Sequence, residues 1–500
     1  MPDFRTTIFK TFYSPDGGIE FNPSAGEGIR RFNRYLDEDI LDARISIEIP
    51  LSAEAGKESD RIKLGGSTLY NYRKIDNEEY RVLPGGGPNT TITTLDIDAF
   101  MLDRFTLIGD SIIDFYYFSL DEARNHSFGK SRIDAAFGMI TYDLLKDLKF
   151  SGGLRAEHTY IFTDVDKFHE LGYARNDPRR ANVTDFPNVN EVDIREWHLL
   201  PSGSLIYKIE GDKLSRVNLR LNYSKTLARP SIRELNDAAI VDNEFRTFFY
   251  GNSDLKIARV SNYDFRAESY FKNGNNLSVS FFYKDFKDHI EMGFGLKGIT
   301  WENVPKSNVA GIELEGKVDL ADAIELRGNL TLVRSESQFI RRDISINDAG
   351  EKVYVPLDTI YRPMFGQAPY LVNTMISYKS DTLGLTATLS YNLQGERLVI
   401  AGAFKGWPDV YEMPRHLLDF KVSKRLGEHF TLSLTVRDIL NAPVLRSYFI
   451  PNEEQTTYNS NLFKEAISRI EGKPGNRDNW QDYDRFRFGT TYLLSVGYKF

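Results

Sequence analysis

The chain has 500 residues, with 63 basic and 71 acidic side chains, a formal net charge of -8 at pH 7 and no cysteine. This charge argues against a nucleic-acid-binding protein, and the lack of cysteine is compatible with passage through an oxidising periplasm. Mean hydropathy is -0.40, and no apolar run of about 18 residues is present, which excludes a membrane-spanning helix. A membrane-spanning β-barrel is not excluded, because only alternate residues of its strands face lipid.

The first 30 residues do not have the pattern of a signal peptide, because they contain no apolar core. An outer-membrane protein needs such a signal. A barrel interpretation therefore requires that the chain lacks its natural beginning. We expect residues 1–30 to be an extracellular loop segment and residues 31–500 to form the barrel domain. Charged side chains are spread through the segment, at Asp3, Arg5, Lys10, Asp16, Glu20 and Glu27.

Segments of alternating apolar and polar residues recur along the chain. In the last of them, Leu494 and Val496 share one face and Ser495 and Gly497 the other, which is the period of a β-strand. A slip by one residue in a membrane would place side chains such as Arg220 in lipid, at a cost of about 2–4 kcal/mol, so the apolar set faces outward. The pattern predicts about fifteen strands. They cover 29–50, 60–81, 128–143, 147–163, 193–209, 213–229, 258–273, 275–292, 306–319, 323–339, 367–379, 383–398, 412–425, 429–446 and 487–500.

Short and long connections alternate between these strands. Short ones include 144–146, 210–213, 321–323 and 426–428, and long ones run roughly over 82–127, 164–192, 230–257, 340–366 and 447–486. Antiparallel outer-membrane barrels have short periplasmic turns and long extracellular loops, whereas a soluble β-sandwich gives no reason for this alternation. Bacterial single-chain barrels have even strand numbers, so an odd count predicts an unclosed edge.

Several segments resemble the C-terminal barrel of TonB-dependent outer-membrane receptors. The most specific is "NYSKTLARPSIREL" at 222–235, followed by "GNSDLK" at 251–256, where the family typically shows S-x-T-x-x-R-P and then GNPDLKPE. Ser253 and Ile257 stand where the family often has proline. The other similar segments are "RYLDEDILDARISIEIPL" at 34–51, "LKFSGGLRAEHT" at 148–159, "SNYDFRAESYF" at 261–271, "FFYKDFKDHIE" at 281–291, "GIELEGKVDL" at 311–320, "YNLQGERL" at 391–398 and "VRDILNAPV" at 436–444.

The resemblance implies a 22-strand barrel, of which this chain would supply the eighth to the last strand. The signal peptide, the plug domain that contacts TonB and about seven strands would be missing. Expected partners are outer-membrane lipid, TonB through that plug, a siderophore, cobalamin or oligosaccharide cargo, and the barrel-assembly machinery, which reads a C-terminal aromatic residue such as Phe500. Without the plug, the chain alone is expected to be inactive in energised uptake.

No catalytic, cofactor or metal site is predicted, the substrate-binding residues are unknown, and the chain is not expected to be an enzyme. The histidines are scattered, no GxSxG or P-loop motif is present, and "PGGGP" at 84–88 has the composition of a flexible turn. The acidic group Asp37, Glu38, Asp39 and Asp42 lacks the spacing of a calcium loop, and a solvated strand end is the simpler interpretation. Polar residues expected to face the lumen, as wall or as cargo contacts, are Arg155, Glu157, Arg220 and Lys421, and loop aromatics that are candidates for cargo contact are Phe248, Phe249 and Tyr250.

Two other classes remain open from the sequence. A self-contained porin-like barrel with passive function would need fourteen or sixteen strands that close on themselves. A secreted soluble β-protein, such as a glycan-binding module, would turn its apolar faces inward.

Overall fold

The computed structural model describes residues 4–8, 12–13, 19–20, 29–51, 60–84, 115–120, 126–165, 191–211, 214–236, 238–242, 247–295, 298–346, 352–402, 408–449 and 480–499. Fifteen long strands of these ranges pair in series as one antiparallel sheet. In order they are β4 (Ile29–Pro50), β5 (Arg61–Pro84), β7 (His126–Leu145), β8 (Leu148–Val165), β9 (Val192–Ile209), β10 (Leu214–Ala228), β13 (Ala258–Phe271), β14 (Asn276–Phe294), β15 (Ile299–Ala321), β16 (Ile324–Ile346), β18 (Tyr370–Ser380), β19 (Leu385–Gln394), β22 (Arg415–Leu426), β23 (Phe430–Arg437) and β26 (Thr491–Tyr498).

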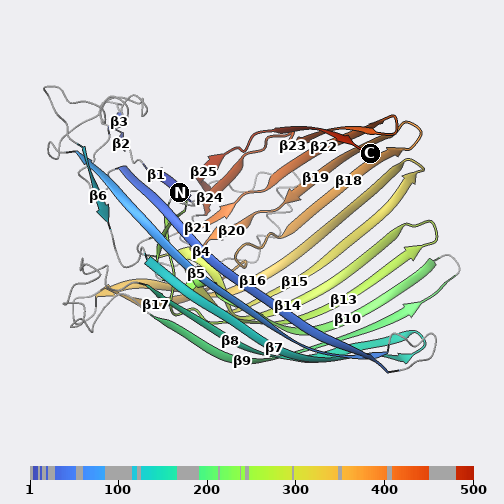
Figure 1. Ribbon diagram of the computed structural model, residues 1–500, viewed down its shortest axis with the longest axis horizontal. Helices are drawn as coiled ribbons and strands as arrows, with labels where there is room; N and C mark the ends of the chain where they lie inside the picture. Colours follow the sequence, from blue (N-terminus) through green and yellow to red (C-terminus); the bar gives the residue numbers. More distant parts are fainter. Residues whose placement is uncertain are drawn as a thin grey trace.

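The strand ends of this sheet differ in the connections that they carry. At one end the turns are short: β7 and β8 are separated by Lys146 and Asp147, and β22 and β23 by residues 427–429, where Gly427 has a φ of 65°. At the other end the connections are longer and include several shorter strands (Figure 1). The short-turn end is the periplasmic end of an outer-membrane barrel, so the opposite end is extracellular.

Large apolar side chains on the convex face of the sheet are exposed. Ile45 is 73 % exposed, Leu199 65 % and Leu221 55 %, and their alternate neighbours Arg44 and Arg220 make ion pairs with Asp42 and Glu268. A soluble sandwich would cover such a face. Repeated exposure of apolar residues at period two is instead the surface that a barrel presents to lipid.

The sheet has two free edges within the described residues. β26 pairs with β23 alone, and β4 pairs with β5 over its full length. On its other side, β4 pairs with the five residues of β1 (Phe4–Ile8), which lie opposite residues 30–34. No pairing joins β4 to β26 among the described residues. Figure 1 shows the sheet as an open trough, with these two strands at its opposite edges.

The extracellular end carries a second, four-stranded sheet. It consists of β20 (Arg397–Ile400), β21 (Asp409–Glu412), β24 (Val444–Phe449) and β25 (Trp480–Phe486), paired in that order. Backbone hydrogen bonds fasten it to β14, because the Ala401 N–H donates to the Met292 carbonyl at 3.0 Å and the Phe294 N–H donates to the Ala401 carbonyl at 2.9 Å. The loops at this end are therefore partly folded against the wall.

An apolar core joins this small sheet to the opposite strands of the trough. Its buried members come from β8, β9, α2 (Ile232–Leu235), β12 (Thr247–Tyr250), the segment between β12 and β13, β15, β20 and β21. The short helix α2 begins with a capping box, in which Ser231 accepts from the Glu234 N–H and the Glu234 carboxylate accepts from the Ser231 N–H. The buried residues are Ile161, Val192, Leu235, Phe249, Leu255, Ile299, Trp301, Val399, Ile400 and Val410.

The remaining short strands extend the wall or the loops. β6 (Phe115–Leu120) pairs with β5, β17 (Lys352–Arg362) pairs with β16, and β11 (Ala239–Asp242) pairs with β12. β2 (Phe12–Tyr13) pairs with β3 (Ile19–Glu20) within the segment expected to be a loop. None of the helices within the described ranges has the length and apolar character needed to span a membrane.

Within the described residues, the wall has the fifteen long strands that the sequence predicts, but some of the predicted strand limits were wrong. The strand expected at 429–446 ends at Arg437, because Asp438 and Asn441 adopt φ values of 51° and 43°, and the chain then enters β24 of the small sheet. The strand expected at 383–398 is divided into β19 and β20. The strand expected at 306–319 is longer, because β15 begins at Ile299. Phe500 lies outside the described residues.

Candidate functional site

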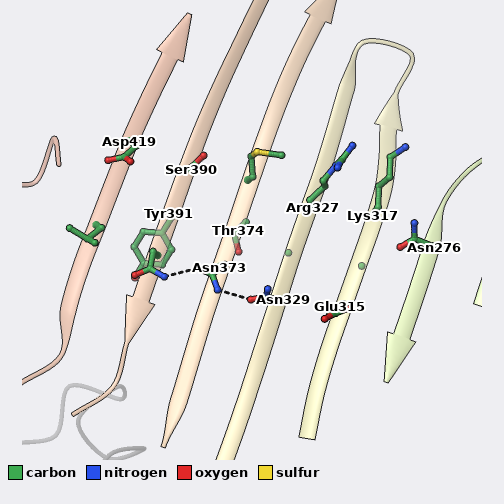
Figure 2. Close-up of a pocket in the computed structure, with 15 residues that line it drawn as sticks. Asn276, Glu315, Lys317, Arg327, Asn329, Asn373, Thr374, Ser390, Tyr391 and Asp419 are labelled. Carbon is green, nitrogen blue, oxygen red and sulfur yellow. Dashed lines mark hydrogen bonds between the residues drawn. The ribbon is translucent and has the colours of Figure 1, made fainter. Parts of the chain in front are cut away.

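A polar pocket of about 510 Å³ lies on the concave, luminal face of the wall (Figure 2). It spans β14, β15, β16, β18, β19 and β22, which turn their polar alternate residues to this side because the apolar ones face lipid. Its polar and charged lining includes Glu315, Lys317, Arg327, Asn329, Asn373, Asn392 and Asp419.

Three asparagines on neighbouring strands form a ladder across the pocket. Asn392 of β19 donates to the Asn373 Oδ1 at 2.5 Å, and Asn373 of β18 donates to the Asn329 Oδ1 of β16 at 2.7 Å (Figure 2). The strand register places the three side chains directly opposite one another. Each amide has two N–H donors and two acceptor lone pairs, so the ladder leaves hydrogen-bonding capacity for a ligand.

An ion-pair network continues from the pocket along the luminal face toward β10. Glu315 accepts from Arg266 of β13 at 2.7 Å, Arg266 also donates to Glu268 at 2.8 Å, and Glu268 accepts from Arg220 of β10 at 3.1 Å. Ser278 of β14 donates to Glu315 at 3.2 Å. This network pairs charges of both signs and makes the lumen wall polar without a large excess charge.

A second luminal cluster confirms that Arg155 and Glu157 face inward together. The Glu157 carboxylate is bound by both Arg155 and Arg229, and Arg229 also donates to the Thr159 hydroxyl at 2.8 Å. Arg155 reaches the Ser67 hydroxyl of β5 at 3.2 Å. These contacts tie β5, β8 and the end of β10, so the side chains have a wall-forming role.

A buried charge cluster connects the wall to the small sheet. Arg362 of β17 forms ion pairs with Glu291 of β14 and, at 2.9 Å, with Asp409 of β21, and its guanidinium lies 3.8 Å from the centroid of the Phe339 ring. Burial opposes the charge of Arg362, but the two carboxylates outweigh it and hold the pKa of Arg362 above its ordinary value. The Asp409 carboxylate also accepts from the Gly402 N–H at 2.7 Å.

A change of face on β14 brings Glu291 into this cluster. Lys287 is exposed on the lipid side, whereas His289 and Glu291, which share its parity, are buried on the inner side. Asp288 between them has a φ of 56°, a left-handed conformation that costs a non-glycine residue free energy and inverts the alternation. Sequence alternation alone assigns Glu291 to the lipid face, so the cluster was missed.

His289, Ser307 and Glu291 have the residue types of a catalytic triad but not its accessibility. The Ser307 Oγ lies 2.9 Å from the His289 Nδ1, and the Glu291 Oε2 lies 3.4 Å from the His289 Nε2. Ser307 is only 1 % exposed, and its hydroxyl donates to Ser337. A substrate has no access to this serine in the conformation described, and the group serves as buried polar packing.

The other residues expected from the sequence are dispersed. Arg220 belongs to the luminal network, and Lys421 lies two residues from Asp419 on the luminal face of β22. Phe249 is 3 % exposed and packs 5.5 Å from Trp301, which argues against direct cargo contact, and Tyr250 is half-buried. The side chain of Phe248 lies outside the described residues, as do residues 85–88 of the glycine-rich turn.

The described residues contain no group of three or more histidine or acidic side chains placed to hold a metal ion. In the acidic group on β4, Asp42 pairs with Arg44 at 2.8 Å and Glu38 accepts from Asn71 at 3.0 Å. The contacts are exposed, but the group lies in the middle of β4 and not at the strand end that the sequence suggested. His169 lies outside the described part of the chain.

Comparisons with known proteins identify the fold. The siderophore receptor PiuA of Acinetobacter baumannii aligns with a TM-score of 0.55 and 11 % identity over 96 % of this chain and 60 % of its own. The copper transporter OprC aligns with a TM-score of 0.54, 12 % identity and the same coverages. The ferric yersiniabactin uptake receptor FyuA of Yersinia pestis aligns with a TM-score of 0.51 and 13 % identity over 97 % of this chain and 57 % of its own. The chain thus spans less than two thirds of the length of each.

A search of curated protein sequences found no match. The family model of the TonB-dependent receptor-like β-barrel matches residues 3–439. Its members are bacterial outer-membrane transport receptors, and the exposed apolar face of this sheet fits that location. The chain therefore belongs to the TonB-dependent receptor-like β-barrel family of the outer membrane.

Proposed function

We propose that this chain is the C-terminal part of the barrel of a receptor that imports a scarce nutrient with energy supplied through TonB. The observation that carries the proposal is the pairing of a lipid-facing apolar exterior with a polar luminal wall that contains the asparagine ladder. A wall of this kind lets a polar solute pass close to it and contact it reversibly, because hydrogen bonds to the ladder compete with water at small net free energy.

The cargo class is proposed as a polar small molecule, namely a siderophore, cobalamin or an oligosaccharide. The pocket supports this class, because it combines amide groups with Glu315, Lys317, Arg327 and Asp419, which offer charges of both signs. PiuA is described as a siderophore receptor, FyuA as a ferric yersiniabactin uptake receptor and OprC as a copper transporter, so the neighbours themselves differ in cargo. The chain is proposed to have no enzymatic role.

The free edges support the proposal that additional strands complete the barrel. β4 and β26 both begin at the extracellular end and run toward the short turns, so they are parallel to each other. Closing the sheet with antiparallel pairs therefore requires an odd number of strands between β26 and β4. β1, which pairs with the extracellular end of β4, supplies part of one such strand. Unpaired strand edges in hydrocarbon would be costly, which argues against a porin-like barrel made from these fifteen strands alone.

The division into a segment at 1–30 and a barrel domain at 31–500 belongs to the same proposal. So do the plug as the contact for TonB and the C-terminal strand as the contact for the assembly machinery. The test is expression in a cell that lacks its own receptor. The chain alone should give no uptake, and the chain supplied with a family plug and the completing strands should restore it. Uptake by the chain alone would contradict the requirement for additional strands.

A further inference from the structure

Three basic residues stand side by side on the lipid-facing side of the wall, near its extracellular end. The strand register places Arg259 of β13 opposite Lys287 of β14, and Lys287 opposite Lys306 of β15. Each lies an even number of residues from an exposed, lipid-facing residue of its own strand, which puts it on the same face. These reference residues are Phe265 for Arg259, Phe281 for Lys287 and Ile312 for Lys306. Neighbouring strands are about 4.8 Å apart, so the Cα atoms of the three residues span roughly 10 Å.

The two lysines have no ion-pair partner among the residues that the structure describes. Both are exposed. Arg259 pairs with Glu196 at 3.3 Å, where the two side chains remain 55 % and 37 % exposed. Asp285 and Glu336 lie one row closer to the membrane centre, and no ion pair links them to the lysines. Like charges directly opposite on neighbouring strands are destabilising, so Lys287 and Lys306 favour an external anion.

The position of this row relative to the membrane identifies the kind of anion. Tyr223, Tyr263 and Tyr283 form a row of aromatic rings on the same face, with centroids 5.1 and 6.1 Å apart. Such a row marks the level of the membrane interface. Lys287 lies four residues beyond Tyr283, which at a tilt near 45° is about 9 Å farther out. Flexible lysine side chains at that level reach the headgroup layer.

The same row is the last one that faces lipid on β14. Beyond it, Asp288 inverts the face, so that His289 turns inward to Ser307 and Glu291 to Arg362. The buried cluster therefore holds the backbone on the extracellular side of the lysines in place. Lys287 and Lys306 extend from this rigid part of the wall.

We propose that Lys287 and Lys306, flanked by Arg259, bind the phosphate group of a lipid headgroup in the extracellular leaflet. Lysine ammonium groups bind phosphate as point charges, and two of them at adjacent positions hold one anion between them. The inference goes beyond nutrient uptake, since it needs the lipid-facing surface and the orientation of the sheet but no cargo.

The test uses the full chain in detergent micelles, with native mass spectrometry to measure bound lipid. Phosphatidic acid and diacylglycerol with the same acyl chains differ only in the phosphate. The double variant K287Q/K306Q should bind phosphatidic acid about 30-fold more weakly, as expected for the loss of two basic side chains at a lipid surface. The matched control K130Q/K421Q removes two exposed lysines away from this row, since Lys130 lies opposite Tyr72 and Phe162 and Lys421 faces the lumen, and it should bind nearly as the parent does.

Three outcomes would overturn the proposal: equal loss in both double variants, equal binding of diacylglycerol, or displacement of phosphatidic acid by inorganic phosphate at a similar concentration. The third would indicate an anion site without lipid specificity. If the double variant does not fold, K306Q supplies a second readout. Its melting temperature without phosphatidic acid should be unchanged or higher, because a repulsion is removed, and the increase caused by phosphatidic acid should be smaller than in the parent. An unchanged increase would contradict the proposal.

Discussion

Arg362 and Glu291 form an ion pair whose side chains are 0 % and 1 % exposed. Together with Asp409 they connect the wall strand β14, the extension β17 and the small extracellular sheet. Charges so deeply buried contribute little net stability as a pair, but breaking the pair leaves an uncompensated charge. The cluster therefore specifies where the small sheet attaches.

The first prediction concerns loss of the central cation. Arg362→Leu should destabilise the chain by about 3–5 kcal/mol, because Glu291 and Asp409 are left buried without their partner. Chemical denaturation in detergent measures the change. The control is Arg341→Leu, which breaks the more exposed pair with Asp358 between β16 and β17 and should cost about 1 kcal/mol or less. Equal costs at both positions would show that burial does not govern the cluster.

The second prediction separates the steps of the asparagine ladder. Asn373→Leu removes two hydrogen bonds and Asn392→Leu removes one, so the first should weaken cargo binding more than the second. Each bond is worth about 0.5–1.5 kcal/mol, and the luminal setting keeps the effect on folding small. Titration of a receptor completed with plug and strands gives the affinities. Unchanged cargo affinity in both variants would remove the ladder from the proposed binding surface.

Much of the wall could be predicted from the sequence because lipid imposes a strict alternation. Leu219, Leu221 and Tyr223 follow it without interruption, and β10 lies where the pattern placed it. The pattern fails where lipid no longer dictates the faces. Asp288 inverts the alternation, and Val399 and Ile400 enter a core that depends on contacts with Ile161, far away in the chain. Neither the attachment of the small sheet nor the Arg362 cluster has a local signal.

The third prediction tests the close approach of neighbouring strands at Gly153. A Cβ added there would lie 2.3 Å from the Gly138 carbonyl oxygen and 2.9 Å from the Met139 Cα, both backbone atoms that cannot move aside. Gly153→Ala should therefore disrupt the pairing of β7 and β8 and lower the heat-stable fraction in gel-mobility assays. Gly316→Ala is the matched control, since the nearest atom there is the Leu277 Cδ1 at 3.5 Å. Equal losses would contradict a steric cause.

The fourth prediction tests which face of the wall meets lipid. Leu221 is 55 % exposed on the outer face, whereas Asn222, its neighbour on β10, belongs to the inner face. Leu221→Arg should destabilise the membrane-inserted chain by about 1–2 kcal/mol, because the guanidinium enters hydrocarbon two residues inward of the Tyr223 row, between the interface and the middle of the apolar band. Asn222→Arg adds the same side chain to the water-filled side and should change stability by less than about 1 kcal/mol. Denaturant titration in lipid vesicles compares the two. A larger cost at Asn222 than at Leu221 would reverse the assignment of the faces, and with it the placement of Lys287 and Lys306 on the lipid side.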